Sequence, residues 1–192
     1  MLSAARRWAL APAAIETRHD LEDPLLLGGV VPSEAAAADA LEMLENWDVT
    51  TARVAADQLA YAVETGTRDE FRAALAGKGP RTDQRLARTL APVLGERATL
   101  AWDLACVPYV AGQAYLAGLV TEAAAWRACL TAARVVQRTF AGWEPFGVEL
   151  LAGRHFWSGE ESTAHFHVFR ALVLEREGPW RIAWDTPLDD EP

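Results

Sequence analysis

Hydrophobic positions dominate one long stretch near the middle of the chain, residues 98–120. Within it only Thr99, Asp103 and Gln113 are plainly polar, and only Asp103 is charged. Apolar side chains recur at helical spacing on one face of this stretch, and the opposite face is apolar as well. A helix that is hydrophobic on every side belongs in the interior of a protein or of a membrane. We predict that this stretch is the buried central helix of a mostly helical domain.

Helical periodicity and capping residues indicate further helices before and after the central one. Ser33, Thr51 and Ser162 each precede an apolar-periodic run, as N-cap residues do. Thr67 and Glu70 have the spacing of a capping box. The helices expected from these patterns cover about residues 4–15, 34–47, 52–65, 68–75, 83–94, 122–140, 143–153 and 163–177.

Two segments between these helices read as loops, residues 19–32 and 78–82. The first has an apolar middle, and we expect the leucines at 25–27 to enter the core. The predicted fold class is therefore all-α, with residues 1–192 forming one globular multi-helix domain. The alternative for the carboxy-terminal part is a small β-hairpin across residues 166–184, because the run VFRALVLE also suits strands.

The central stretch is long enough to be considered as a membrane span, since about 18 apolar residues suffice. Against this, Asp103 would cost roughly 2.5–3.5 kcal/mol near the bilayer centre. Pro108 would also leave a carbonyl unsatisfied in a lone span. Residues 1–16 do not resemble a secretion signal either. We expect a cytoplasmic protein that does not enter a membrane.

Charge and composition narrow the function classes. The 192 residues carry a formal net charge of −9, which argues against nucleic acid as a partner because phosphates are bound by basic side chains. The same charge suits a soluble protein, or one that meets a basic partner. Cys106 and Cys129 are the only cysteines and lie at apolar helical positions, so we expect two reduced thiols in the core.

Short runs spread over the whole chain match one family pattern in their order and spacing. They are Trp8, Trp47, GTRDEF at 66–71, AWDLA at 101–105, GLVTEAAAW at 118–126, FAGWEPF at 140–146, GRHFW at 153–157 and PWRIAW at 179–184. Through these runs the chain resembles a bacterial family of uncharacterised proteins, the domain of unknown function numbered 1266. The resemblance implies a helical, bacterial, cytoplasmic protein, and it brings no established activity. Family members often carry arginine where Cys106 follows the WDLA run in this chain.

Asp103 is the first candidate functional residue, because a buried carboxylate needs a charged or hydrogen-bonding partner. Arg154 and Arg134 are the arginines that we expect to reach it. One interpretation makes Asp103 a general base or a ligand anchor. We favour the other, in which Asp103 forms a structural ion pair between the central helix and residues 153–157.

Histidines suggest metal binding only weakly. His165 and His167 would lie about 200° apart on a helix and could not share an ion there, although on a strand they could. His155 offers no recognisable third-ligand spacing, and the chain has no HExxH or CxxC motif. We therefore predict no metal and no other cofactor.

Tryptophan is unusually frequent, and four of the eight tryptophans fall in the last part of the chain. Trp143, Trp157, Trp180 and Trp184 are interleaved there with Arg154 and Arg181. They could form an aromatic pocket with a cationic rim, which suits a small anionic or planar ligand. They could equally form a surface for a protein partner, or simply fill the core between helices.

The function that we predict from the sequence is binding rather than catalysis. The expected partner is another protein, and one form of the hypothesis makes that protein basic. A neutralising or immunity-type role would suit a small acidic protein without catalytic motifs. The alternative is a small enzyme or ligand-binding protein that uses Asp103, Arg154 and His155 in an aromatic pocket. The residues assigned to binding on these grounds are Asp103, Trp143, Arg154, His155, Trp157 and Trp180.

Overall fold

The computed structural model describes residues 2–189, and within them the chain is helical with no β-strand. The α-helices are α1 (Ala4–Leu10), α2 (Ala14–His19), α3 (Glu34–Glu45), α4 (Ala52–Glu64), α5 (Arg68–Leu75), α6 (Arg81–Leu94), α7 (Leu100–Leu116), α8 (Glu122–Thr139), α9 (Trp143–Ser158) and α10 (Thr163–Leu174). Short 3₁₀ helices follow α1, α6 and α10, at Ala11–Ala13, Gly95–Arg97 and Pro179–Arg181. The all-α prediction is confirmed. In the described structure, α10 and a 3₁₀ turn occupy the region where a hairpin was the alternative.

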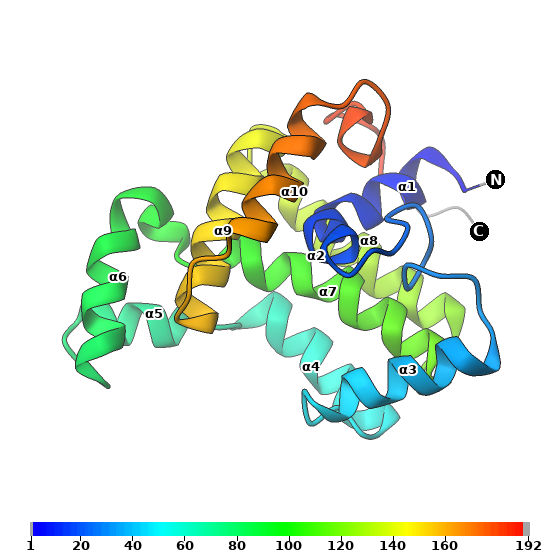
Figure 1. Cartoon of the computed structure of the whole chain (residues 1–192), viewed down its shortest axis with the longest axis horizontal. Helices are drawn as coiled ribbons and strands as arrows, with labels where there is room; N and C mark the ends of the chain where they lie inside the picture. The colour runs from blue at the N-terminus through cyan, green and yellow to red at the C-terminus, as the bar shows by residue number, and fades with distance from the viewer. Residues whose placement is uncertain (1, 190–192) are drawn as a thin grey trace.

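Helix α7 is the central helix, as its hydrophobic pattern predicts, and α3, α4, α8 and α9 pack around it (Figure 1). Thirteen of its 17 residues are buried, Asp103 and Gln113 included. The helix continues through Pro108, which ends neither its hydrogen-bonding pattern nor its burial. No helix among the described residues is both long enough and apolar enough to cross a membrane.

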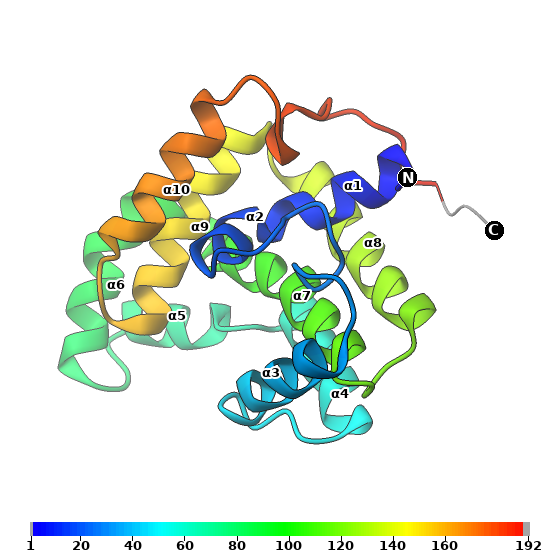
Figure 2. The same cartoon turned by 45° about the vertical axis from the view of Figure 1, so that its right-hand side comes forward.

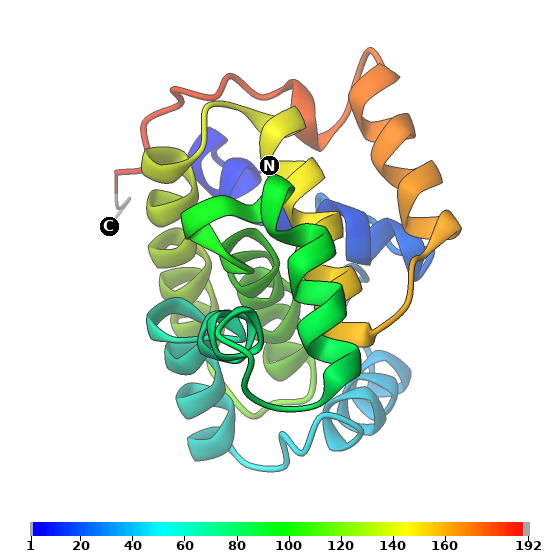
Figure 3. The same ribbon diagram turned by 90° about the vertical axis from the view of Figure 1, so that its left-hand side faces the viewer.

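Helices α5 and α6 form a pair at one end of the molecule, and α6 packs on α9 (Figure 3). Phe71 of α5 and Leu94 of α6 are fully buried in a small core of their own. On another side of the molecule α2 lies beside α10, which brings residues near the two ends of the chain together (Figure 2). This last contact places the candidate site described below.

Helix α9 shows where the expected boundaries were wrong. The prediction ended it at Gly153, but the helix runs on to Ser158. A Cβ atom on Gly153 would lie 2.7 Å from Cβ of Trp102, so the absence of a side chain allows α9 to approach α7 closely. Gly153 therefore acts as a packing residue inside a helix rather than as a helix terminator.

The amino-terminal region differs from the prediction in two respects. The first helix does not run unbroken to residue 15, because the segment at Pro12 is 3₁₀ and the chain then continues as α2 to His19. In the loop that follows, Leu27 is buried as expected. Leu25 and Leu26 are exposed, because the tight turns of this loop direct only one of the three leucines inward.

Candidate functional site

Asp103 lies in α7 with only 3% of its surface exposed, and it accepts several hydrogen bonds. The backbone N–H and the hydroxyl of Thr67 each donate to Oδ1 at 2.9 Å, and the hydroxyl of Thr99 donates to Oδ2 at 3.2 Å. Burial raises the pKa of the Asp103 carboxyl, although the bonds from Thr67, the charge of Arg68 and the bond from Thr99 partly offset this effect.

The arginine partner of Asp103 is Arg68, whose Nη1 lies 3.3 Å from Oδ2, so the expectation of Arg154 or Arg134 was wrong. Arg68 is itself buried, and its guanidinium also donates to the backbone carbonyl of Val63 at 3.0 Å. The predicted capping box fails for the same reason, because the Thr67 side chain bonds to Asp103 instead of capping α5. This sealed network ties the α4–α5 corner to α7 and favours the structural interpretation of Asp103.

Most of the carboxy-terminal tryptophans lie in the core. Trp143 packs on Trp8, Trp180 and Trp184 with ring centroids 4.7, 6.0 and 4.8 Å away. The indole N–H groups of Trp143, Trp180 and Trp184 donate to backbone carbonyls, as that of Trp180 does to Ala11 at 2.9 Å. Trp143 and Trp180 therefore join α1, α9 and the carboxy-terminal segment, and they line none of the pockets described below.

Trp157 stands apart from this cluster. It is 48% exposed at the end of α9, and its ring lies 5.1 Å from that of Trp102 and 5.9 Å from that of Trp47. Beside it is a surface hollow of about 490 Å³ between α9 and the α5–α6 corner, which includes Lys78 and Pro80. Trp157 therefore offers an exposed apolar surface while its ring packs on two other tryptophans.

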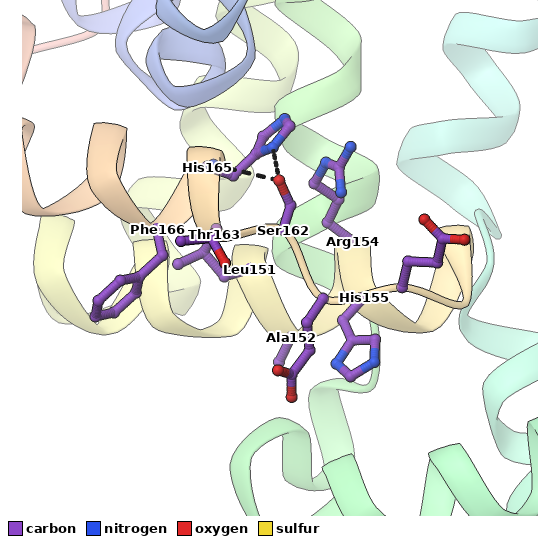
Figure 4. A pocket seen from close by; sticks show the side chains of 10 residues that line it. Leu151, Ala152, Arg154, His155, Ser162, Thr163, His165 and Phe166 are labelled. Carbon is purple, nitrogen blue, oxygen red and sulfur yellow. Dashed lines mark hydrogen bonds between the residues drawn. The ribbon is translucent and has the colours of Figure 1, made fainter.

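Arg154 and His155 line a different pocket, of about 330 Å³, between the carboxy-terminal half of α9 and the start of α10 (Figure 4). The lining residues are Leu151, Ala152, Arg154, His155, Glu160, Glu161, Ser162, Thr163, His165 and Phe166. In Figure 4, Arg154, Ser162 and His165 lie close together at one side of the pocket, and His155 lies lower on α9. Of the residues assigned to binding from the sequence, only Arg154 and His155 line the same pocket.

His165 is the least exposed polar group at this pocket, with 1% of its surface accessible. Its Nδ1 is 2.6 Å from the Oγ of Ser162, and its Nε2 is 3.2 Å from Oε2 of Glu16. Because a carboxylate only accepts hydrogen bonds, Nε2 carries a proton, and in the neutral imidazole Nδ1 then accepts the proton of the Ser162 hydroxyl. The three side chains thus form a continuous line, Ser162–His165–Glu16.

A second layer of side chains surrounds this line. Oε1 of Glu16 is 3.6 Å from Nε of Arg154, and the ring of His19 stacks on that of His165 with centroids 3.8 Å apart. His19 in turn contacts the carboxylate of Asp20 at 3.1 Å. Glu16 and His19 both belong to α2, so the packing of α2 on α10 completes the arrangement.

Sequence reasoning missed Ser162, His165 and Glu16 as a group. Ser162 and His165 have the three-residue spacing that brings side chains together at a helix start, and this local signal was readable. Glu16 is 149 positions from His165 in the chain, and no local pattern reports such a contact. Among the described residues, no group of three His, Cys, Asp or Glu side chains is arranged to hold a metal ion.

Fold and site together define an all-α protein with a pocket of mixed polar and apolar lining where the end of one helix meets the start of the next. The family described as "protein of unknown function (DUF1266)" has a model that matches residues 41–184, more than half of the chain, and the chain belongs to this family. No curated protein and no solved structure matches the chain. The matched segment contains Arg154, Ser162 and His165, while Glu16 lies before it.

Proposed function

We propose that the pocket between α9 and α10 binds a small ligand that carries one carboxylate or phosphate group. The observation that carries this proposal is the convergence of Arg154, Ser162 and His165 on one accessible pocket. The anionic group of such a ligand would lie at the side of the pocket where these three residues converge.

Arg154 is the residue that would hold this group. Its one charged partner is Glu16, at 3.6 Å through Nε, so the terminal nitrogens of the guanidinium have no acceptor among the described residues. A guanidinium binds carboxylate and phosphate through paired hydrogen bonds. Its side chain is only partly exposed, so a bound anion would meet a charge that water screens incompletely.

The start of α10 adds to the attraction. Helix α10 has 12 residues, and its first amide N–H groups cannot bond within the helix. This end carries partial positive charge and lies at the pocket through Ser162 and Thr163. Glu160 and Glu161 line another part of the same pocket, so a ligand with a single anionic group fits better than a polyanion.

Amide chemical shifts during titration with acetate, and separately with inorganic phosphate, would test the proposal. We expect saturable shifts at residues 154 and 162–166 that Arg154→Gln abolishes. Arg170→Gln is the matched control, because Arg170 is an exposed arginine of α10 that does not line the pocket. Shifts that are absent, or that persist in Arg154→Gln, would refute the proposal.

A second candidate function, binding of a protein partner, is favoured by one observation, the exposed Trp157 packed on Trp102 and Trp47. Tryptophan anchors of this kind dominate protein interfaces, and the net charge of −9 suits a basic partner. A neutralising role is one form of this hypothesis. Photo-crosslinking from position 157 in the native host should capture one protein, and crosslinking from the exposed Val148 should not. Equal capture from both positions would count against it.

The cytoplasm is the location that we propose. Cys106 and Cys129 are both free thiols in the structure, which agrees with a reducing compartment.

A further inference from the structure

We infer that the pocket between α9 and α10 is a catalytic site in which Ser162 is the nucleophile that hydrolyses small carboxylic esters. This inference rests on the proposed function, because the anionic group of the substrate would lie against Arg154. The evidence is the Ser162–His165–Glu16 line, which has the parts and the order of a nucleophile, a base and a group that orients the base.

The hydrogen bonds at Ser162 prepare its hydroxyl for attack. The backbone N–H of His165 donates to Ser162 Oγ at 3.3 Å, which uses one lone pair of that oxygen. The hydroxyl proton is then directed at Nδ1 of His165, 2.6 Å away. A base within hydrogen-bond reach of a serine hydroxyl is the first geometric requirement for nucleophilic catalysis.

Ser162 is more exposed than its base, His165, and this difference suits a nucleophile. His165 is almost fully buried, so its imidazole is fixed by Ser162 on one side and by Glu16 on the other. Ser162 is half-buried and lines the pocket, where a substrate can reach its oxygen. The hydroxyl is therefore accessible from the pocket, while the imidazole beside it is held in place by its neighbours.

The first turn of α10 supplies donors for the charge that develops on the carbonyl oxygen. Thr163 and Ala164 are its first two residues, and their N–H groups precede the first intrahelical bond, which Phe166 makes to the carbonyl of Ser162. Backbone amides at a helix start beside the nucleophile stabilise an oxyanion. The amide of Thr163 directly follows Ser162 in the chain, and that of Ala164 is one residue further on.

The reaction balances without any further cofactor. Ser162 Oγ forms a bond to the ester carbonyl carbon while its proton passes to Nδ1 of His165. The bond to the alcohol oxygen then breaks, and His165 returns the proton to the departing alcohol. Water attacks the acyl-Ser162 ester, gives one proton to His165, and releases the carboxylic acid as Ser162 recovers that proton. The net change is ester plus water to acid plus alcohol.

Capping of α10 alone does not account for this geometry. Ser3, Ser33, Thr51 and Thr121 cap their helices through the same hydroxyl-to-amide contact. Within the described part of the chain, each of those side chains caps without a histidine base in hydrogen-bond reach. Ser162 adds the contacts to His165 and, through it, to Glu16.

A fluorophosphonate probe, which forms a covalent bond with activated serines, tests the inference on the intact chain. We expect one adduct on the wild-type protein, mapped by peptide mass spectrometry to Ser162. The wild-type chain should also hydrolyse 4-nitrophenyl acetate and, with lower KM, the hemisuccinate ester, whose free carboxylate would meet Arg154. Labelling spread equally over Ser33, Ser158 and Ser162 would refute the inference. This result is read on the wild-type chain alone, so it does not depend on the folding of any variant.

Variants separate nucleophile, base and cap. Ser162→Asn keeps an N-cap acceptor and should abolish labelling and hydrolysis while the thermal midpoint stays near that of the wild type. His165→Asn should lower kcat about 100-fold or more. Glu16→Gln, at a positioning residue, should lower kcat less and change its pH profile, which a purely structural contact would not do. Ser33→Ala loses a cap of the same kind and should keep full activity per folded molecule.

The outcomes also distinguish this inference from the proposed function. If acetate binding depends on Arg154 but no serine is labelled, the ligand-binding function stands and the catalytic inference fails. If neither is seen, both fail. If hydrolysis survives in Ser162→Asn, another group performs it, and Ser162 is not the nucleophile.

Discussion

Removal of the Asp103 carboxylate should destabilise the fold strongly. Asp103→Ala leaves the charge of Arg68, which is only 6% exposed, without its carboxylate partner. It also removes the acceptor of the Thr67 N–H. Breaking a buried ion pair from one side typically costs about 3–5 kcal/mol of unfolding free energy. Stranded neutral donors add about 1–3 kcal/mol each where water cannot reach them. We therefore expect a loss of at least about 4 kcal/mol, because the buried pair alone costs about that much and the stranded donors add to it.

The loss comes from the stranded partners rather than from the charge of Asp103 itself. Burial raises the pKa of this carboxyl, which means that its ionised form is less favoured in the fold than in water. Removing both charges should consequently cost less than removing one. The double variant Asp103→Leu, Arg68→Met is expected to be more stable than Asp103→Ala.

Urea unfolding followed by far-ultraviolet circular dichroism measures these differences, provided that the slope of the transition is unchanged. The matched control is Asp57→Ala, which breaks the exposed pair of Arg53 and Asp57 at 3.7 Å. Exposed pairs of this kind contribute about 0.3–0.5 kcal/mol. If Asp103→Ala lost no more stability than Asp57→Ala, the structural interpretation of the buried network would be refuted.

Three further perturbations have expected outcomes that follow from single positions. Gly66→Ala should destabilise more than Gly79→Ala in thermal unfolding. Both glycines have positive φ, but a Cβ on Gly66 would overlap the buried carboxylate of α7, whereas Gly79 has no atom within 4 Å. Burial, with a neighbouring carboxylate, raises the pKa of Glu22 from its ordinary 4.5 to about 7, so the folded chain holds this proton and stability should fall as pH rises through that interval. Glu22→Gln should flatten this slope in unfolding measured between those pH values, and an unchanged slope would show that the group is not the source. Burial also raises the pKa of both thiols, that of Cys129 to about 12, so Ellman's reagent should react slowly with Cys106 and Cys129 until the chain is unfolded.

Elements that depend on local sequence could be predicted well. The caps at Ser33, Thr51 and Ser162 were readable because an N-cap hydroxyl bonds an amide three residues away, and each makes that bond in the structure. The central helix was readable because burial on every side needs apolar residues on every side. Its observed ends, Leu100 and Leu116, fall inside the expected stretch.

Contacts between distant segments could not be read in this way. The choice of Arg68 over Arg154 as the partner of Asp103 depends on how the α4–α5 corner packs on α7, which no local pattern encodes. The end of α9 was predicted wrongly for a related reason. Local sequence alone favours a helix end at Gly153, whereas the glycine in fact allows α9 and α7 to approach closely. The sequence could say that Trp143 and Trp157 were notable, but not that one is core and the other surface.

The pocket combines residues that local sequence places with one residue that a distant segment contributes. Ser162 and His165 are set by the start of α10, and Arg154 by α9, all within the segment that the family model matches. Glu16 comes from α2, outside that segment, and reaches His165 only because α2 packs beside α10. A change at residue 16 would leave the family fold and the serine–histidine pair in place while removing the group that orients the imidazole. The Ser162–His165 contact is what separates this serine from those that only cap a helix, and the carboxylate at position 16 orients the base.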